Sequence, residues 1–371
     1  MNAVSAFDLA AVCAHFPLAG RFVAGVPHGN GHINDTFAVT FDRHGATTRY
    51  ILQRINHRIF RDVPSLMDNI ARVSAHVAGK IRAEPPETPP RQALTLIRSG
   101  QENFYRDPQG NYWRAYVFLE RASTHDVVTS PEIAREAARA FGTFQRQLAD
   151  LPGPRLHETI PHFHHTRRRF AAFEQAVAAD AHGRAGGVAA EISFVRRREP
   201  LVDVLLKLQA AGDAPERITH NDTKANNVML DDATGRGVCV IDLDTVMPGL
   251  SLFDFGDMVR SATNSAAEDE TDLARVHAQL PIFDALVDGY LRAAGSLLTR
   301  AEIEHLARAA QLMTFEVGLR FLTDYLQGDV YFRTRRPGHN LDRARNQFAL
   351  VASMEAQRSQ MEAIVRRHLP S

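Results

Sequence analysis

The stretch His220-Asn221-Asp222-Thr223-Lys224-Ala225-Asn226-Asn227 decides the fold. It sets Asp222 two residues before Lys224 and five residues before Asn227. A carboxylate at Asp222 can accept the proton of an attacking hydroxyl, and Asn227 can reach back to hold a magnesium ion. Lys224 can stabilise the charge that develops on a transferred phosphoryl group. The pattern H-x-D-x-x-x-x-N therefore predicts a catalytic loop for phosphoryl transfer.

A second carboxylate follows the apolar run Val238-Cys239-Val240-Ile241, which reads as a strand. Burying a carboxylate at such a place is costly unless it is paired or binds a metal. Because magnesium prefers carboxylate and phosphate oxygens, we expect Asp242 to be its ligand together with Asn227. Asp244 is predicted to hold a second metal ion or its water shell. ATP and Mg²⁺ are thus the expected cofactors.

The triplet Asp254-Phe255-Gly256 matches the metal-binding motif of protein kinases, but it lies 32 residues past Asp222 and does not end a pair of strands. We therefore predict a structural role for this segment. In that role Asp254 or Asp257 bonds backbone amides of the catalytic loop or caps a helix. This prediction leaves Asp242 as the metal-binding aspartate.

Secondary-structure signals divide the chain into a strand-rich first third and a helical remainder. Strands are predicted at 21–26, 35–41, 50–54 and 112–119, with one helix over 63–78. Further helices are predicted at 131–148, 164–180, 191–211, 281–295, 301–327 and 341–368, and a strand pair at 227–230 and 238–243. We therefore predict an α+β, protein-kinase-like two-lobe fold. Residues 1–120 form the nucleotide-binding lobe, and residues 121–371 form the helical catalytic and acceptor-binding lobe.

The first lobe is expected to hold the nucleotide. Gly29 and Gly31 lie in a Gly-rich turn whose backbone amides can approach phosphates. The segment from Tyr116 to Glu120 is expected to form the hinge between the lobes and to offer backbone groups to adenine. Both elements are predicted to place ATP between the two lobes.

The strand at 50–54 ends where kinases place a lysine on the α- and β-phosphates, but no lysine is present. Arg54 is predicted to take this role, with Gln53 as the alternative. Asp68, on the following helix, is the candidate partner of that cation, and a solvated helix face is the other interpretation of Asp68.

Five stretches resemble the aminoglycoside phosphotransferase superfamily and, within it, the N-acetylhexosamine 1-kinases. They are residues 31–37, 50–56, 220–227, 241–257 and 315–332. The resemblance implies phosphorylation of the anomeric hydroxyl of GlcNAc or GalNAc. It matches the family's base to Asp222 and its substrate-contacting arginine and tyrosine to Arg320 and Tyr331. The remaining implied site residues are His32 for the substrate, and Asn34 and Thr36 for the nucleotide.

Arg320 also stands out without the resemblance, because it lies in the apolar helical run 315–326. A solvated charge would be misplaced in such a run. Arg320 is therefore predicted to bind sugar oxygens through its planar guanidinium, and a buried salt bridge with Asp324, one turn on, is the alternative. Elsewhere in the chain, the triplet His162, His164 and His165 lacks convergent carboxylates and is predicted to be a solvated helix start.

Composition narrows the class of protein. The chain has 43 Lys and Arg against 43 Asp and Glu, so nothing indicates a nucleic-acid partner. Its two cysteines lie far apart, and Cys239 is expected to be a small buried hydrophobe. No segment approaches the roughly 20 apolar residues that span a bilayer. We expect a cytoplasmic enzyme whose partners are ATP and a small sugar.

Two other functions stay open at this point. One is a kinase of another small alcohol, such as homoserine, choline or an aminoglycoside. The other is a nucleotide-binding pseudokinase scaffold, against which the intact set of Asp222, Lys224, Asn227 and Asp242 argues. Arg320 disfavours cationic acceptors, whereas the carboxylate of homoserine is compatible with it. The sequence does not determine the hexose, its C2 and C4 preference, the oligomeric state or the pathway.

Overall fold

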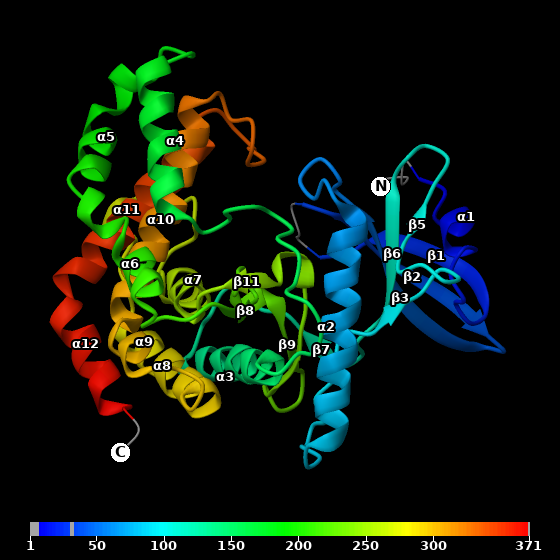
Figure 1. Ribbon diagram of the computed structural model, residues 1–371. Helices are drawn as coiled ribbons and strands as arrows, with labels where there is room; N and C mark the ends of the chain where they lie inside the picture. The colour runs from blue at the N-terminus through cyan, green and yellow to red at the C-terminus, as the bar shows by residue number, and fades with distance from the viewer. Residues whose placement is uncertain (1–6, 30–32, 370–371) are drawn as a thin grey trace.

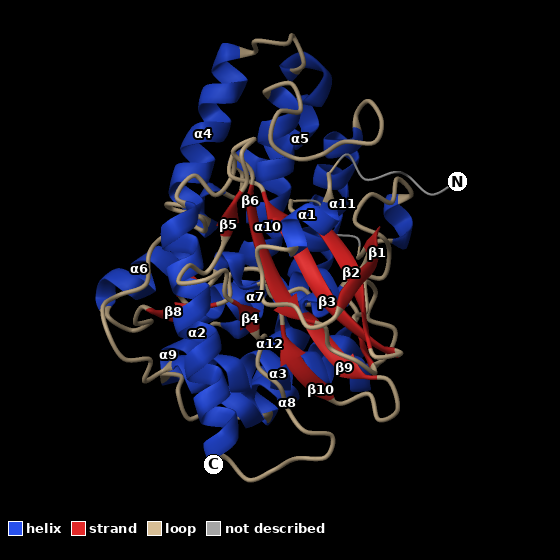
Figure 2. Cartoon of the chain, turned by 90° about the vertical axis from the view of Figure 1, so that its right-hand side faces the viewer, coloured by secondary structure: helices blue, strands red, loops and turns tan. Residues whose placement is uncertain are grey.

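The computed structural model describes residues 7–29 and 33–369, which fold into a sheet-rich N-terminal lobe and a helical C-terminal lobe (Figure 1). The N-terminal lobe contains α1 (Leu9–Cys13), β1 (Arg21–Pro27), β2 (Asp35–Arg43), β3 (Ala46–Ile55), α2 (Val63–Ala83), β4 (Leu96–Ile97), β5 (Tyr105–Arg106) and β6 (Tyr112–Val117). Its sheet has the order β1-β2-β3-β6-β4, and β5 also pairs with β6. Figure 2 shows these strands in front of the helical lobe.

The C-terminal lobe is built mainly from helices. They are α3 (Pro131–Leu148), α4 (Thr166–Ala179), α5 (Ala189–Arg196), α6 (Val204–Ala211), α7 (Ser251–Thr263), α8 (Leu280–Ala294), α9 (Arg300–Glu304), α10 (Leu306–Leu326), α11 (His339–Ala356) and α12 (Arg358–Arg367). Short strands β7 (Ala122–Ser123), β9 (Val228–Asp231) and β10 (Gly237–Val240) form one sheet, and β8 (Arg217–Thr219) pairs with β11 (Met247–Gly249). The predicted α+β two-lobe fold is confirmed.

The two faces of the N-terminal sheet have different roles. Side chains alternate between the faces along each strand. Leu52 of β3 and Trp113 of β6 are fully buried in an apolar cluster with α1. The opposite face carries Ile55 and Tyr116, which pack in the cluster that contains α2. A polar residue on β3 or β6 therefore reaches the space between the lobes only if it lies on this second face.

Helix α2 begins where local signals place it and shares an apolar cluster with β3 and β6. The Asp62 side chain caps it by accepting a hydrogen bond from the Ser65 amide at 3.1 Å. Ile70 and Val73 are completely buried, and the same apolar cluster includes Phe144 of α3. Because this cluster joins the two lobes, the boundary at residue 120 stays a prediction.

Several predicted helices are interrupted. The range 191–211 contains α5 and α6, separated by a 3-10 turn at Glu199–Leu201 that holds Pro200, a residue that lacks the amide a continuous helix needs. The range 341–368 contains α11 and α12, and 301–327 contains α9 and α10. Within residues 7–29 and 33–369, no helix is long and apolar enough to cross a membrane.

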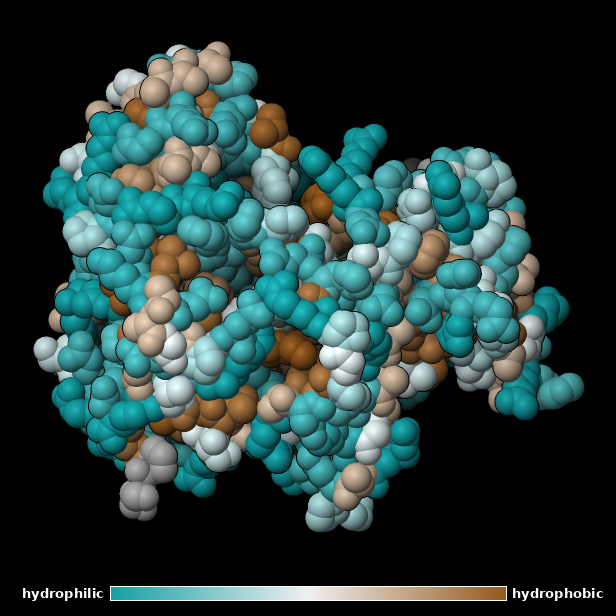
Figure 3. Space-filling view, in the orientation of Figure 1, coloured by the Kyte–Doolittle hydropathy of each residue, from teal (hydrophilic) through white to brown (hydrophobic). Residues whose placement is uncertain are grey.

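Helix α10 is the centre of the C-terminal lobe, where it packs against α7, α11 and α4. The loop that follows it, orange in Figure 1, extends toward the N-terminal lobe. The space-filling view shows that the visible face is largely hydrophilic and is notched between the two lobes (Figure 3).

Candidate active site

Two aspartates of α7 hold the catalytic loop between β8 and β9 through hydrogen bonds to its backbone amides. The Asp254 carboxylate accepts hydrogen bonds from the amides of His220 at 2.9 Å and Asn221 at 2.7 Å. Asp257 accepts the amide of Thr223 at 3.0 Å. Burial raises the pKa of Asp254 to about 6, against the lowering effect of His220 and of the two amides. The predicted structural role of these aspartates is confirmed.

Asp222 lies at the centre of the loop with the two residues predicted beside it. Lys224 Nζ is 2.9 Å from Asp222 Oδ1, and Asn227 Nδ2 donates to the Asp222 carbonyl at 2.8 Å and to Oδ2 at 3.2 Å. Burial by itself would raise the pKa of Asp222, but the Lys224 ammonium outweighs it and lowers the pKa below its ordinary value. Asp222 is therefore an ionised carboxylate at neutral pH, as a general base requires.

The donor set for a divalent cation is present next to Asp222. Asn227 uses its Nδ2 for both of its side-chain hydrogen bonds, which leaves the amide Oδ1 free to ligate. Asp242 has left-handed backbone geometry, with φ 58°, and the residue as a whole is exposed to solvent, although the surrounding protein desolvates its carboxyl group. Burial by the surrounding protein, with Asp244 and Asp222 nearby, raises its pKa to about 7. A bound cation would offset this repulsion, so Asn227 and Asp242 fit magnesium.

No three His, Cys, Asp or Glu side chains converge as a metal site in the part of the chain that the structure describes. This finding agrees with a site of one carboxylate and one carboxamide, because nucleotide phosphates commonly complete the coordination of Mg²⁺.

The structure corrects the assignment of Asp244 as a metal ligand. Asp244 is 3% exposed, and one of its oxygens accepts a hydrogen bond from Arg114 of β6 while the other accepts from Asn34 Nδ2 at 2.7 Å. A carboxylate engaged on both oxygens is an ion-pair partner rather than an open ligand. Asn34 thus reaches the predicted site, but through Asp244.

Arg114 is the site residue that the sequence interpretation missed. It is 1% exposed, and its Nε donates to Gln53 Oε1 at 2.9 Å on the neighbouring strand. Gln53 Nε2 in turn donates to Thr36 Oγ1 at 2.9 Å. Strand register is the signal that could have identified Arg114, because Arg114 lies directly opposite Gln53 in the β3–β6 pair. Arg114 is thus a buried cation on the second face of the sheet, paired with Asp244.

The prediction that Arg54 contacts the nucleotide is wrong. Arg54 Nε donates to Asp35 at 2.7 Å, and its guanidinium lies 4.8 Å from the centre of the Phe7 ring. It follows Gln53 by one residue, so the strand pleat points it to the α1 face, away from Asp222. Asp68 does not pair with Arg54 either, because its Oδ2 atom lies 3.6 Å from Nη1 of Arg72.

The remaining nucleotide-side residues have separate outcomes. Gly29 has φ +73°, a conformation that glycine adopts without strain. Gly31 and His32 lie outside the described residues. The Glu120 carboxylate accepts from Arg49 Nε at 3.0 Å, and the Arg49 guanidinium lies 3.9 Å from the centre of the Phe118 ring. The hinge role of Glu120 and the nucleotide role of Gly29 stay predictions.

Arg320 lies among aromatic rings near the end of α10. Its guanidinium carbon is 5.0 Å from the ring centre of Phe163, 5.7 Å from that of Tyr331 and 5.4 Å from that of Phe332. The structure therefore brings the two predicted substrate residues, Arg320 and Tyr331, together. Tyr331 is 44% exposed, so the ring cluster opens to solvent on its side.

The alternative of a salt bridge between Arg320 and Asp324 is wrong. The Asp324 carboxylate instead accepts the amides of Val330 at 2.9 Å, Tyr331 at 2.8 Å and Phe332 at 2.9 Å. Asn340 of α11 also donates to it, at 2.9 Å. Asp324 therefore shapes the loop that presents the aromatic rings, and it leaves the guanidinium of Arg320 without its carboxylate.

The histidine triplet is only partly a solvated helix start. His165 caps α4 by accepting the Arg168 amide at 3.4 Å, but His164 is 7% exposed. The His164 ring contacts Glu316 of α10 through Nδ1 at 2.8 Å and the Asn221 carbonyl through Nε2 at 3.0 Å. It therefore connects the catalytic loop with the helix that carries Arg320, a link that no local pattern indicates.

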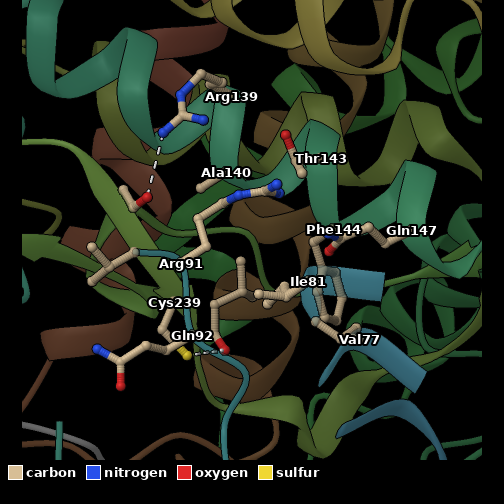
Figure 4. A pocket seen from close by; sticks show the side chains of 13 residues that line it. Val77, Ile81, Arg91, Gln92, Arg139, Ala140, Thr143, Phe144, Gln147 and Cys239 are labelled. Atoms are coloured by element: carbon tan, nitrogen blue, oxygen red, sulfur yellow. Dashed lines mark hydrogen bonds between the residues drawn. The ribbon is translucent and has the colours of Figure 1, made fainter. Parts of the chain in front are cut away.

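Behind the metal-binding strand lies a small cavity of about 30 Å³ between α2, α3 and β10 (Figure 4). Cys239 and Val240 of β10 line it together with Phe144. Burial raises the pKa of the Cys239 thiol to about 12, so this cysteine is an unreactive packing residue, as predicted. The cavity lining also includes Arg91 and Arg139, and it contains neither Asp222 nor Asp242.

Comparisons with solved structures show the same fold. An aminoglycoside phosphotransferase from Alicyclobacillus acidocaldarius matches with a TM-score of 0.60 and 13% identity, covering 97% of this chain and 95% of that one. A choline kinase from Cryptosporidium parvum gives 0.59 and 13%, covering 97% and 98%. An amicoumacin kinase in complex with AMP-PNP and Ca²⁺ gives 0.57 and 12%, covering 98% and 95%. The model of the phosphotransferase enzyme family matches residues 24–301, and the chain belongs to this family.

Proposed function

We propose that this phosphotransferase moves the γ-phosphoryl group of ATP, with Mg²⁺, to the anomeric hydroxyl of an N-acetylhexosamine such as GlcNAc or GalNAc. The observation that carries the proposal is Arg320 among Phe163, Tyr331 and Phe332, with no carboxylate bonded to its guanidinium within the described residues. Aromatic faces suit the C–H surface of a sugar, and guanidinium N–H groups suit its oxygens.

Each residue of the site has a distinct role in this proposal. Asp222 accepts the proton of the acceptor hydroxyl, and Lys224 stabilises charge on the transferred group. Asn227 and Asp242 hold the magnesium ion, which neutralises phosphate charge when it is bound. Arg114, kept in place by Asp244, is the cation on the nucleotide side of the cleft. The AMP-PNP and Ca²⁺ bound by the amicoumacin kinase support the use of a nucleotide and a divalent cation.

The charges around Arg320 support a neutral or anionic acceptor. Burial and the nearby Arg320 lower the pKa of Arg169, whose guanidinium donates to the Phe163 carbonyl at 2.8 Å. Two arginines therefore lie close together on the acceptor side, and a cationic alcohol such as choline would be repelled there. The same pair favours homoserine, through its carboxylate, as the second candidate acceptor.

A panel of acceptors tests the proposal. The purified protein is supplied with Mg-ATP and, in turn, GlcNAc, GalNAc, glucose, homoserine and choline, and ATP consumption is measured. We expect turnover with GlcNAc or GalNAc, and phosphorus NMR should place the new ester at C1. A sugar 6-phosphate, or brisk turnover of homoserine without sugar turnover, would move the protein to another acceptor class.

Replacement of Arg320 tests the acceptor pocket. Because Arg320 is proposed to bind the sugar equally in the ground and transition states, Arg320→Ala should raise KM for the sugar and leave KM for ATP nearly unchanged. Some loss of kcat is also expected, since phosphoryl transfer depends on positioning. Arg300→Ala is the matched control, because Arg300 pairs only with Glu304 on the surface of α9. Equal weakening of ATP and sugar by Arg320→Ala would make Arg320 a structural residue.

A further inference from the structure

The peptide unit that leads into Asp222 is held at both of its polar atoms by histidine rings. Its carbonyl oxygen, which belongs to Asn221, lies 3.0 Å from His164 Nε2. Its N–H, which belongs to Asp222, donates to His220 Nδ1 at 3.3 Å. Because the orientation of this peptide sets the direction of the Asp222 side chain, the two histidines control where the base points.

This peptide needs support because Asn221 is in a left-handed conformation, with φ +64°. Asparagine tolerates that region better than most residues, but a non-glycine residue there is strained and persists only where its surroundings hold it. The Asn221 side chain contributes by donating to the Thr245 carbonyl at 3.0 Å. Outside the β8–β11 region, Asp254 of α7 accepts the Asn221 amide at 2.7 Å. His164, two residues before α4, contacts the Asn221 carbonyl at 3.0 Å.

The two histidines have different hydrogen-bonding requirements. His220 donates through Nε2 to the Ile241 carbonyl at 2.9 Å and accepts the Asp222 amide through Nδ1, so a neutral ring satisfies both contacts. His164 instead faces two acceptors, the Asn221 carbonyl and the carboxylate of Glu316. Only the doubly protonated ring donates to both.

Several charged groups surround the contact between His164 and Glu316. Glu316, on α10, is 0% exposed and also accepts the hydroxyl of Thr166. Burial would raise the pKa of Glu316, but His164, Thr166 and Arg320 outweigh it and lower the pKa. The other charged groups around this pair are Asp254 on α7 and Arg169 on α4. A buried hydrogen bond between His164 and the Glu316 carboxylate therefore lies beneath the catalytic loop.

The same segment reaches the acceptor pocket. Phe163, the residue before His164, packs 5.0 Å from the guanidinium of Arg320, and Glu316 lies one helical turn before Arg320 on α10. His164 is thus the shared contact of the base-bearing loop and the acceptor-binding helix.

We propose that His164 is a positioning residue that orients the peptide preceding Asp222 and couples it, through Glu316, to the acceptor site. The inference rests on the proposed roles of Asp222 and Arg320. Membership of the family does not by itself imply this role. The proposal is that turnover depends on the contact between His164 and the Asn221 carbonyl, and not simply on a buried ring.

Two substitutions separate the two contacts of the ring. In His164→Asn the side-chain amide can occupy the place of Nδ1 and keep the bond to Glu316, while the bond to Asn221 is lost. In His164→Gln the longer amide can occupy the place of Nε2 and keep the bond to Asn221, while the hydrogen bond to Glu316 is lost. We expect His164→Asn to lower kcat by on the order of 10- to 100-fold through misplacement of the base, with KM for ATP unchanged.

We expect the opposite order for stability, because His164→Asn leaves the buried Glu316 carboxylate a hydrogen-bond donor at residue 164, whereas His164→Gln removes it. His164→Gln should show the larger fall in melting temperature and yet retain most of its kcat. Thr166→Val, which removes the other donor to Glu316 and leaves the loop contact intact, should lower the melting temperature without lowering kcat. Equal loss of kcat in the Asn and Gln variants, or a kcat order that follows the melting temperatures, would overturn the proposal.

The readout keeps this inference separate from the choice of acceptor. Turnover is measured with whichever acceptor of the panel the wild-type protein phosphorylates, and in parallel as slow hydrolysis of ATP by water. If no sugar is phosphorylated but the two variants still differ in ATP hydrolysis as expected, the acceptor proposal fails and the role of His164 is supported. If a sugar is phosphorylated and the variants do not differ, the reverse holds.

Discussion

Asp222→Ala should depress kcat by on the order of 10²–10⁴, the range expected when a general base is lost. Asp222 is kept ionised by Lys224 at 2.9 Å, and its carbonyl and Oδ2 both accept from Asn227, so it combines the charge and the placement that proton transfer needs. The effect should fall on the chemical step, and KM for ATP should change little. Steady-state kinetics at saturating acceptor measure it.

A conservative variant and a surface control sharpen this prediction. Asp222→Asn keeps the size of the side chain and removes only the basic carboxylate, so its kcat should fall as far as that of the alanine variant. Asp213, an exposed aspartate between α6 and β8, is the matched control, and Asp213→Ala should leave kcat intact. Retention of kcat within about threefold by Asp222→Asn would exclude Asp222 as the base.

Asp242→Asn should abolish turnover while the protein remains folded. Asp242 is the one carboxylate of the proposed magnesium site, and it makes no hydrogen bond or ion pair with other residues of 7–29 and 33–369. Without it the ion would lose its main protein ligand. The substitution also removes a charge that Asp244 and Asp222 repel, so the melting temperature should not fall. Turnover and thermal unfolding are measured on the same preparation.

Asp254→Asn provides the contrast within the same site. Asp254 accepts two backbone amides of the catalytic loop, and an asparagine would turn an NH₂ group toward one of them. A buried donor left unsatisfied costs about 1–3 kcal/mol, so this variant should unfold at a lower temperature. If Asp254→Asn instead ended turnover without affecting stability, and Asp242→Asn did not, the metal would belong to Asp254.

The sequence was sufficient wherever the decisive geometry is local. Asp222, Lys224 and Asn227 meet because they lie within one loop, and their spacing along the chain limits how far apart they can be. The start of α2 after Asp62 is also local, because the cap joins Asp62 to the Ser65 amide only three positions along the chain. The order of strands and helices followed from periodicity, which reports the face that each segment buries. These signals were enough to predict the two-lobe fold.

Tertiary structure alone decided which distant side chains share the site. Strand register and pleat direct Arg54 away from the candidate site and Arg114 toward it. Arg114 pairs with Asp244, which is 130 positions further along the chain. His164 meets Glu316 across 152 positions. Such pairs form because packing of whole elements brings their side chains together, and the free energy of that packing comes from many apolar contacts elsewhere. A single sequence specifies that packing but does not display it as a local pattern.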